Sequence, residues 1–74
     1  MRKFIVITDM REAIGVEEQV GRKTVLNVDH IQSIEGVEAH IADVLNYRSV
    51  ITMHSGRTFF PSEYQADIMN LINS

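Results

Sequence analysis

Three cationic or titratable side chains of one predicted hairpin could bind an anion: Arg48, His54 and Arg57. An arginine guanidinium binds two oxygens of a phosphate or carboxylate at once, because its N–H groups form a planar fork. Tyr47 and Phe59 lie beside them in the sequence and could stack on a base. These five residues are our candidate site for a small phosphate-bearing ligand, and charges on a solvated strand edge are the simpler interpretation. Further cations lie at the ends of predicted strands and could join this cluster: Arg2, Lys3, Arg22 and Lys23.

Acidic residues are frequent in two long predicted connections. We expect five of them to face a basic protein partner: Glu12, Glu17, Glu18, Glu38 and Asp43. Charges of this kind speed association with an oppositely charged surface, and salt weakens their effect. The simpler interpretation is a solvated loop, since the ordered oxygens and central glycine of an EF-hand are absent.

Residue patterns that would support catalysis or metal binding are missing from the sequence. The three histidines, His30, His40 and His54, form no i, i+4 pair on a predicted helix. His40 and Asp43 are three residues apart, yet a zinc site needs three or four ligands. The sequence contains no cysteine, no Gly-x-Ser-x-Gly, no Walker phosphate loop and no dinucleotide glycine pattern. We therefore expect no enzymatic activity, no metal and no cofactor.

The size and charge of the chain restrict its class. With 74 residues, it is expected to form a single domain over residues 1–74. A formal net charge of −3 argues against a general affinity for nucleic acid. No apolar run approaches the ~20 residues of a membrane span, and the N-terminus lacks a signal-peptide core. Together with the absence of cysteine, these features predict a soluble cytoplasmic protein that does not associate with membranes.

Apolar and β-branched runs predict strands, and polar stretches with glycine separate them. The expected strands cover residues 4–8, 23–28, 31–35, 48–54 and 57–60. Residues 9–22 form a long polar connection. Asn27, Asp29 and His30 are expected to break the second strand, and Asp29 suits a tight turn because its carboxylate can accept bonds from nearby backbone N–H groups. Residues 37–47 fit helical and strand spacing alike, and we expect a loop with one short helical segment.

A two-residue turn at Ser55-Gly56 is predicted to join the last two strands, since glycine tolerates the positive φ that such turns need. This turn would pair His54 with Arg57, and it decides which side chains share a face. One face would carry Ile51, Met53 and Phe60. The other face would carry Val50, Thr52 and Phe59.

A C-terminal helix is predicted over residues 63–73. Ser62 and Gln65 have the spacing of a capping box, and Glu63 would lie in the positively polarised first turn. An apolar stripe follows at helical spacing: Tyr64, Ile68, Leu71 and Ile72. A helix of this length is not stable alone in water, so it must pack on the sheet.

The expected fold is a small α+β domain, an antiparallel β-meander of four to five strands with one C-terminal helix packed on one face. A single short helix cannot cover both faces, yet most predicted strands are apolar on both. Apolar side chains are therefore expected on the uncovered face: Ile5, Ile7, Val50 and Phe59, or their opposite-parity neighbours. Either the long connections or another chain must cover them, and we expect self-association with a symmetric dimer as the default.

The strand and turn residues resemble those of a known family. Val25-Leu26-Asn27-Val28-Asp29-His30-Ile31, the following Ile34-Glu35, the run Val50 to Phe60 and then Ser62-Glu63 are similar to the FlbD/SwrD-type proteins. These are small bacterial chains associated with flagellar function, and similar chains occur in phage and prophage. The resemblance implies a meander with a C-terminal helix and supplies no catalytic residues. The hairpin also has a remoter similarity to the LytTR DNA-binding domain.

The sequence as a whole favours a small non-enzymatic regulatory or inhibitory protein that binds another protein and self-associates. A phage-encoded inhibitor of a host factor has these properties too. Two alternatives stay open. One is an oligomer that sequesters a nucleotide-like phosphate ligand, and the other is a LytTR-like DNA-binding module, against which the acidic balance argues.

Overall fold

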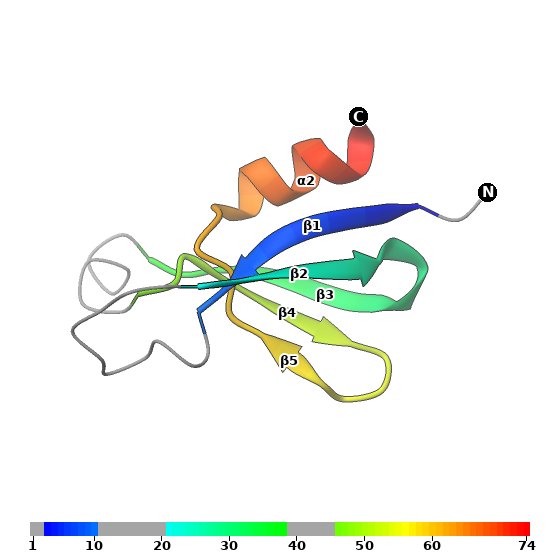
Figure 1. Cartoon of the computed structure of the whole chain (residues 1–74), viewed down its shortest axis with the longest axis horizontal. Helices are drawn as coiled ribbons and strands as arrows, with labels where there is room; N and C mark the ends of the chain where they lie inside the picture. The colour runs from blue at the N-terminus through cyan, green and yellow to red at the C-terminus, as the bar shows by residue number, and fades with distance from the viewer. Residues whose placement is uncertain (1–2, 11–20, 39–45) are drawn as a thin grey trace.

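The computed structural model describes residues 3–10, 21–38 and 46–74 of the chain (Figure 1). The elements within these residues are β1 Phe4–Asp9, β2 Arg22–Asn27, the 3-10 helix η2 Val28–His30, β3 Ile31–Gly36, β4 Ser49–Met53, β5 Thr58–Phe59 and α2 Gln65–Asn73. Every strand pair is antiparallel. The predicted α+β class with a C-terminal helix is therefore confirmed. The strands are divided between two sheets, with the orders β1-β2 and β3-β4-β5.

The first sheet is a two-stranded ribbon with apolar side chains on both faces. Its register runs from Phe4 opposite Asn27 to Asp9 opposite Arg22, so both ends of the predicted 9–22 connection belong to strands. Because side chains alternate along a strand, Ile5 and Ile7 point inward and are buried. The remainder of that connection, residues 11–20, lies outside the described residues.

Of the three residues predicted to break the second strand, Asn27 supplies the side-chain acceptor of the turn, whereas Asp29 donates its backbone N–H. The Asn27 side-chain oxygen accepts a hydrogen bond from the Asp29 backbone N–H at 3.0 Å. This bond caps η2, and it ends β2 one residue earlier than the apolar pattern predicted.

The hairpin between β4 and β5 has a different register from the predicted one. Met53 N–H donates to Arg57 O at 2.8 Å, and Ile51 lies opposite Phe59. The loop therefore has three residues, with Gly56 at φ +90° as its last member. A shift of one residue exchanges the two faces of β5, so Phe59 is buried and Phe60 is half-buried. We predicted that Phe60 would share a face with Ile51 and Met53. This was wrong, because Phe59 takes that position opposite Ile51.

The helix begins at Gln65, two residues later than expected, and the predicted capping box is not formed. Its N-cap is Tyr64, which makes no side-chain capping bond. Gln65 of the predicted capping box binds elsewhere, since its Nε2 donates to Ile34 O at 2.9 Å. Glu63, which was expected in the first helical turn, lies before the helix, and its carboxylate accepts from Thr8 N–H at 2.8 Å. Tertiary contacts thus replace the local cap.

The core lies between the two sheets and the helix. Its buried members are Ile5, Ile7, Leu26, Ile51, Met53, Phe59 and Ile68. Of the predicted helical stripe, only Ile68 is fully buried and Ile72 is half-buried, whereas Tyr64 and Leu71 are exposed. The helix packs on both sheets, since α2 contacts β1 of the first sheet and β3 of the second.

The two sheets meet at one corner, where the end of β1 bonds to the segment after β5. Met10 N–H donates to Phe60 O at 2.8 Å, and Ser62 N–H donates to Thr8 O at 2.9 Å. The strands spread away from this corner in Figure 1. The two sheets diverge, and the space between them has two sides. The helix α2 packs along the side formed by β1 and β3. The opposite side lies between β2 and β5.

Residues 37, 38 and 46–48 belong to no helix or strand. The rest of the ambiguous 37–47 segment, residues 39–45, is outside the described residues. Among the helices of the described ranges, none has the length and apolar character needed to cross a bilayer.

Candidate functional site

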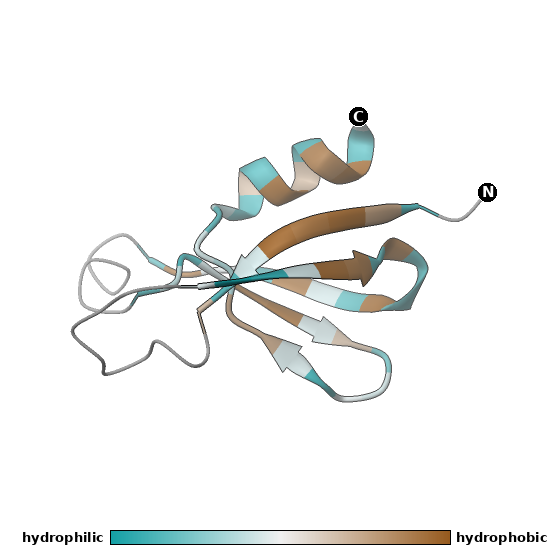
Figure 2. Ribbon diagram, viewed as in Figure 1, coloured by the Kyte–Doolittle hydropathy of each residue, from teal (hydrophilic) through white to brown (hydrophobic). Residues whose placement is uncertain are grey.

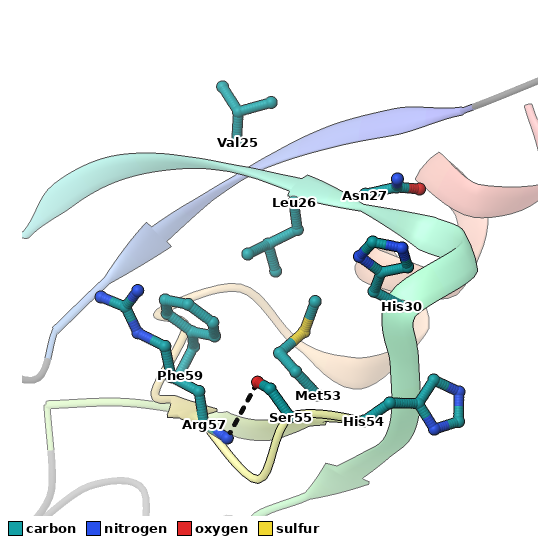
Figure 3. A pocket seen from close by; sticks show the side chains of 9 residues that line it. All are labelled: Val25, Leu26, Asn27, His30, Met53, His54, Ser55, Arg57 and Phe59. Carbon is teal, nitrogen blue, oxygen red and sulfur yellow. Dashed lines mark hydrogen bonds between the residues drawn. The ribbon is translucent and has the colours of Figure 1, made fainter.

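A groove runs along the side between β2 and the β4–β5 hairpin. Its first part is a cavity of about 540 Å³ with nine lining residues: Val25, Leu26, Asn27, His30, Met53, His54, Ser55, Arg57 and Phe59 (Figure 3). Its second part, of about 460 Å³, shares Val25, Arg57 and Phe59 and adds Asp9, Arg22, Lys23 and Thr24. We call the two parts together the β2/β5 groove. Volumes of this size are typical of ligand sites.

The floor of the groove is apolar and belongs to the core. Leu26 points from β2 toward Met53 and Phe59, which come from the other sheet (Figure 3). The three-residue loop is what directs Phe59 to this side, since the predicted register would have turned it away. The Arg57 guanidinium lies 5.1 Å from the centre of the Phe59 ring. The arginine thus adds a positive charge directly beside an apolar surface.

Histidines lie at the turn end of the groove. His54 N–H donates to His30 O at 2.8 Å, and this bond holds the hairpin turn against η2. The His30 ring lies on the groove side, whereas the His54 ring points away from Arg57 and Phe59 (Figure 3). Ser55 Oγ accepts a long bond from Arg57 N–H at 3.4 Å within the turn.

The corner end of the groove is cationic. Arg22, Lys23 and Arg57 all line it, and they are three of the seven lysines and arginines in the chain. Lys23 Nζ donates to Thr8 Oγ1 at 2.9 Å. Among the described lining residues the acidic one is Asp9, whose carboxylate accepts from Phe60 N–H at 3.0 Å. Positive charge therefore concentrates here, although the whole chain carries a formal charge of −3.

The backbone of β2 also faces this side. In an antiparallel ladder, hydrogen-bonded residue pairs alternate with non-hydrogen-bonded pairs. The bond from Val28 N–H to Lys3 O at 2.9 Å makes Lys3 and Val28 a hydrogen-bonded pair, so every second pair from there along the ladder is hydrogen-bonded too. Val25 and Lys23 are consequently non-bonded partners of Val6 and Thr8. Their backbone N–H and C=O groups point away from β1, at the edge of the sheet.

The five predicted ligand residues are separated into two groups. Arg57, His54 and Phe59 line the groove, whereas Arg48 and Tyr47 precede β4 at the far end of that strand. The Arg48 guanidinium lies 5.0 Å from the Tyr64 ring centre and donates to Ser62 O at 3.2 Å. The Tyr47 ring packs 4.9 Å from the Phe60 ring, centre to centre. A strand of five residues spans about 16 Å, so one small ligand cannot touch both groups within one protomer.

Of the predicted partner-facing acidic residues, the structure describes Glu38, which is exposed just after β3. The other four, Glu12, Glu17, Glu18 and Asp43, lie outside the described residues. Within the described ranges, no group of three or more His, Asp or Glu residues is arranged to hold a metal ion.

The sequence predicted that Arg22 and Lys23 could join the cluster, and both line the groove with Arg57, but it did not indicate the other residues that β2 and η2 contribute. Leu26, Asn27 and His30 line the groove together with hairpin residues more than twenty positions away in the sequence. The apolar side chain of Leu26 predicted a buried position, but the sequence did not indicate which strands would pack against it.

A second feature is the outward face of the β1–β2 ribbon. Phe4, Val6 and Val25 are 57%, 51% and 63% exposed, and Val6 lies directly opposite Val25. β1 and the second half of β2 are accordingly hydrophobic in Figure 2. We call these three residues the outer ribbon face. Phe4 and Val6 are opposite-parity neighbours of Ile5 and Ile7, and thus belong to one of the two sets expected on an uncovered face. Of the other set, Ile5, Ile7 and Phe59 are buried and Val50 is half-buried.

Comparison with known protein families, with curated proteins and with solved structures found no match to this chain. The resemblance to FlbD/SwrD-type proteins and the remoter one to LytTR stay predictions, and what the chain does has to be argued from its own surfaces.

Proposed function

We propose that this chain is a small, non-enzymatic regulatory protein that acts by binding another protein and that self-associates as a dimer. The observation that carries the proposal is the outer ribbon face, where three large apolar side chains are exposed on adjacent strands. Exposed apolar patches on small proteins mark interaction surfaces. The absence of cysteine fits action in the reducing cytoplasm, as a bacterial or phage-encoded regulator.

A second copy of the chain is the occupant we assign to the outer ribbon face. The central pair Val6 and Val25 is uncharged, so two such faces can approach without repulsion. A twofold axis between two such faces would set the same patch of both copies together, as isologous interfaces require. Burial of one valine or phenylalanine side chain stabilises by about 1.5–3 kcal/mol, which is a substantial contribution for a domain of this size.

Native mass spectrometry of the full chain, alongside the Val6→Lys variant, tests self-association. We expect the wild-type protein at twice its 8.4 kDa mass and the variant at the single-chain mass, because a buried lysine would lack a partner. Gln32→Lys is the matched control, since Gln32 is exposed on β3 and should leave the dimer intact. A monomeric wild-type protein at micromolar concentration would contradict this part of the proposal.

Sequestration of a nucleotide-like phosphate ligand is the second candidate function. The observation in its favour is Arg57 beside the Phe59 ring in a cavity of about 540 Å³. The distance between Arg57 and Arg48 along β4 weighs against it within one protomer. A ligand retained through purification would appear as extra mass in the same spectra, and Arg57→Ala would remove it.

DNA binding of the LytTR type is the weaker alternative. Its affinity would fall steeply with salt, as phosphate contacts require. The net charge of −3 gives it little support, and no binding at low salt would dispose of it.

A further inference from the structure

We propose that the β2/β5 groove binds an extended, acidic segment of a partner protein, which adds as a further strand to the outer edge of β2, the edge that has no strand partner among the described residues. This inference rests on the proposed function, because it names the chemistry of the protein partner. Three independent properties of the groove support it: an open backbone edge, an apolar floor and a cationic lining.

The backbone edge provides the pairing. Lys23 and Val25 direct their N–H and C=O groups away from β1, and within the described residues these groups have no backbone partner. An incoming strand can bond to both residues, since they are two positions apart. Free edges of this kind are the surface that strand addition uses.

The apolar floor of the groove favours an incoming strand with apolar side chains at alternate positions. Alternate residues of a strand next to β2 would point the same way as Leu26, toward Met53 and Phe59. Apolar side chains at every second position would contact this floor. The remaining side chains would point outward, on the same side as Val25.

The charged residues that line the groove favour a partner segment of opposite charge. Arg22, Lys23 and Arg57 surround the corner end, and the Asp9 carboxylate accepts a bond from Phe60 N–H. A partner segment that carries carboxylates would meet complementary charge there, whereas a basic segment would be repelled. A free phosphate could contact the same cations but would leave the backbone edge of β2 unused. The combination therefore favours a peptide strand.

Fluorescence anisotropy with labelled peptides tests the proposal on the full-length chain. The first peptide alternates Val with Ser and carries consecutive Glu residues at one end, which can reach the cations at the corner end of the groove, and the second carries Lys at the positions of these Glu residues. We expect the acidic peptide to bind with an affinity that falls as salt rises, and the basic peptide to bind at least roughly tenfold more weakly. No binding of the acidic peptide at millimolar concentration, or equal binding of both peptides, would overturn the proposal.

Variants locate the binding site. Arg57→Ala should weaken the acidic peptide by roughly fivefold, and Arg57→Glu should weaken it further. Arg48→Ala is the matched control, because it removes the same charge at the far end of β4 and should leave binding unchanged. Equal effects of Arg48→Ala and Arg57→Ala would overturn the assignment to the groove.

Amide hydrogen exchange, followed by NMR on the wild-type protein, tests strand pairing without any variant. The Lys23 and Val25 amides should exchange several-fold more slowly when the acidic peptide is bound, whereas the Leu26 amide already faces β1 and should change little. Protection confined to other strands would overturn pairing at β2. Binding of ATP that Arg57→Ala abolishes, in the absence of peptide binding, would assign the groove to a phosphate ligand instead.

The two proposals fail in distinguishable ways. A wild-type dimer that Val6→Lys disrupts, but that binds no acidic peptide, would overturn only the groove assignment. A monomer that binds the peptide through Arg57 would overturn only self-association.

Discussion

The space between the two diverging sheets has two sides, and these differ in the side chains that line them. On the side between β1 and β3, α2 inserts Ile68, which is 0% exposed, and polar bonds seal the rims. Gln65 bonds to β3, the Glu63 carboxylate bonds to β1, and the Lys3 ammonium bonds to the last carbonyls of the chain. On the side between β2 and β5, Arg57 and Lys23 line an apolar floor instead.

This difference shows how a short chain can use one side of its core for stability and the other side for binding. One nine-residue helix is enough to close one side, and it does so with apolar contacts and charge-assisted bonds. On the other side the cations lie close together, and β2 has no second strand partner within the described residues. We therefore expect substitutions on the closed side to change the free energy of unfolding, and substitutions on the groove side to change binding.

Ile68→Ala should have the largest effect on stability. The side chain is fully buried between the sheets, and truncation of such a residue costs about 2–5 kcal/mol through lost transfer energy and a cavity. Urea unfolding followed by circular dichroism measures this loss. Met69→Ala, on the exposed side of the same helix, should change the free energy of unfolding by less than about 1 kcal/mol. Similar losses for both variants would mean that α2 does not close this side as described.

Glu63→Ala should rank second. It leaves the Thr8 N–H without its acceptor, and loss of a hydrogen bond to a charged group costs about 1.5–3 kcal/mol. The group is only part-buried, so we expect the lower end of that range. Glu63→Gln retains an oxygen acceptor and should lose less. If Glu63→Gln and Glu63→Ala were equally destabilising, the bond to Thr8 would not be the reason.

Gly56→Ala should destabilise by about 1–2 kcal/mol, through the backbone alone. Gly56 has φ +90°, which side chains with a Cβ rarely adopt, and nothing lies within 4 Å of the added atom. Ser55→Ala in the same turn is the control and should have little effect. An unchanged unfolding midpoint for Gly56→Ala would argue against the three-residue loop, and with it against the position of Phe59.

Arg57→Ala should have the smallest effect on stability, below about 1 kcal/mol, because Arg57 is exposed and, among the described residues, its guanidinium contributes a contact with the Phe59 ring. Thermal unfolding in low and high salt measures it. A loss above 2 kcal/mol would give Arg57 a structural role, and it would weaken the contrast between the two sides.

Much of the architecture was contained in local sequence patterns. The β-branched runs at β1 and β4, the glycine turn at Gly56 and the apolar spacing around Ile68 each predicted the correct element. Because a single short helix cannot cover both faces, we expected apolar side chains on an uncovered face, and Phe4 and Val6 are exposed on the outer ribbon face. These features follow from side-chain alternation and backbone preference, which act within a few residues.

Tertiary structure decided register, caps and neighbours. Ser55-Gly56 suits a loop of two or three residues, and burial of Phe59 against Met53 selects the longer one. Gln65 had the right spacing for a cap, but the unpaired carbonyl of Ile34 on β3 is where it binds. The β2/β5 groove depends on packing between strands distant in sequence, and no local pattern encodes that distance. The sequence alone therefore determined which residues are apolar and which form strands, whereas only the packing of the two sheets brought Lys23 and Arg57 to one site.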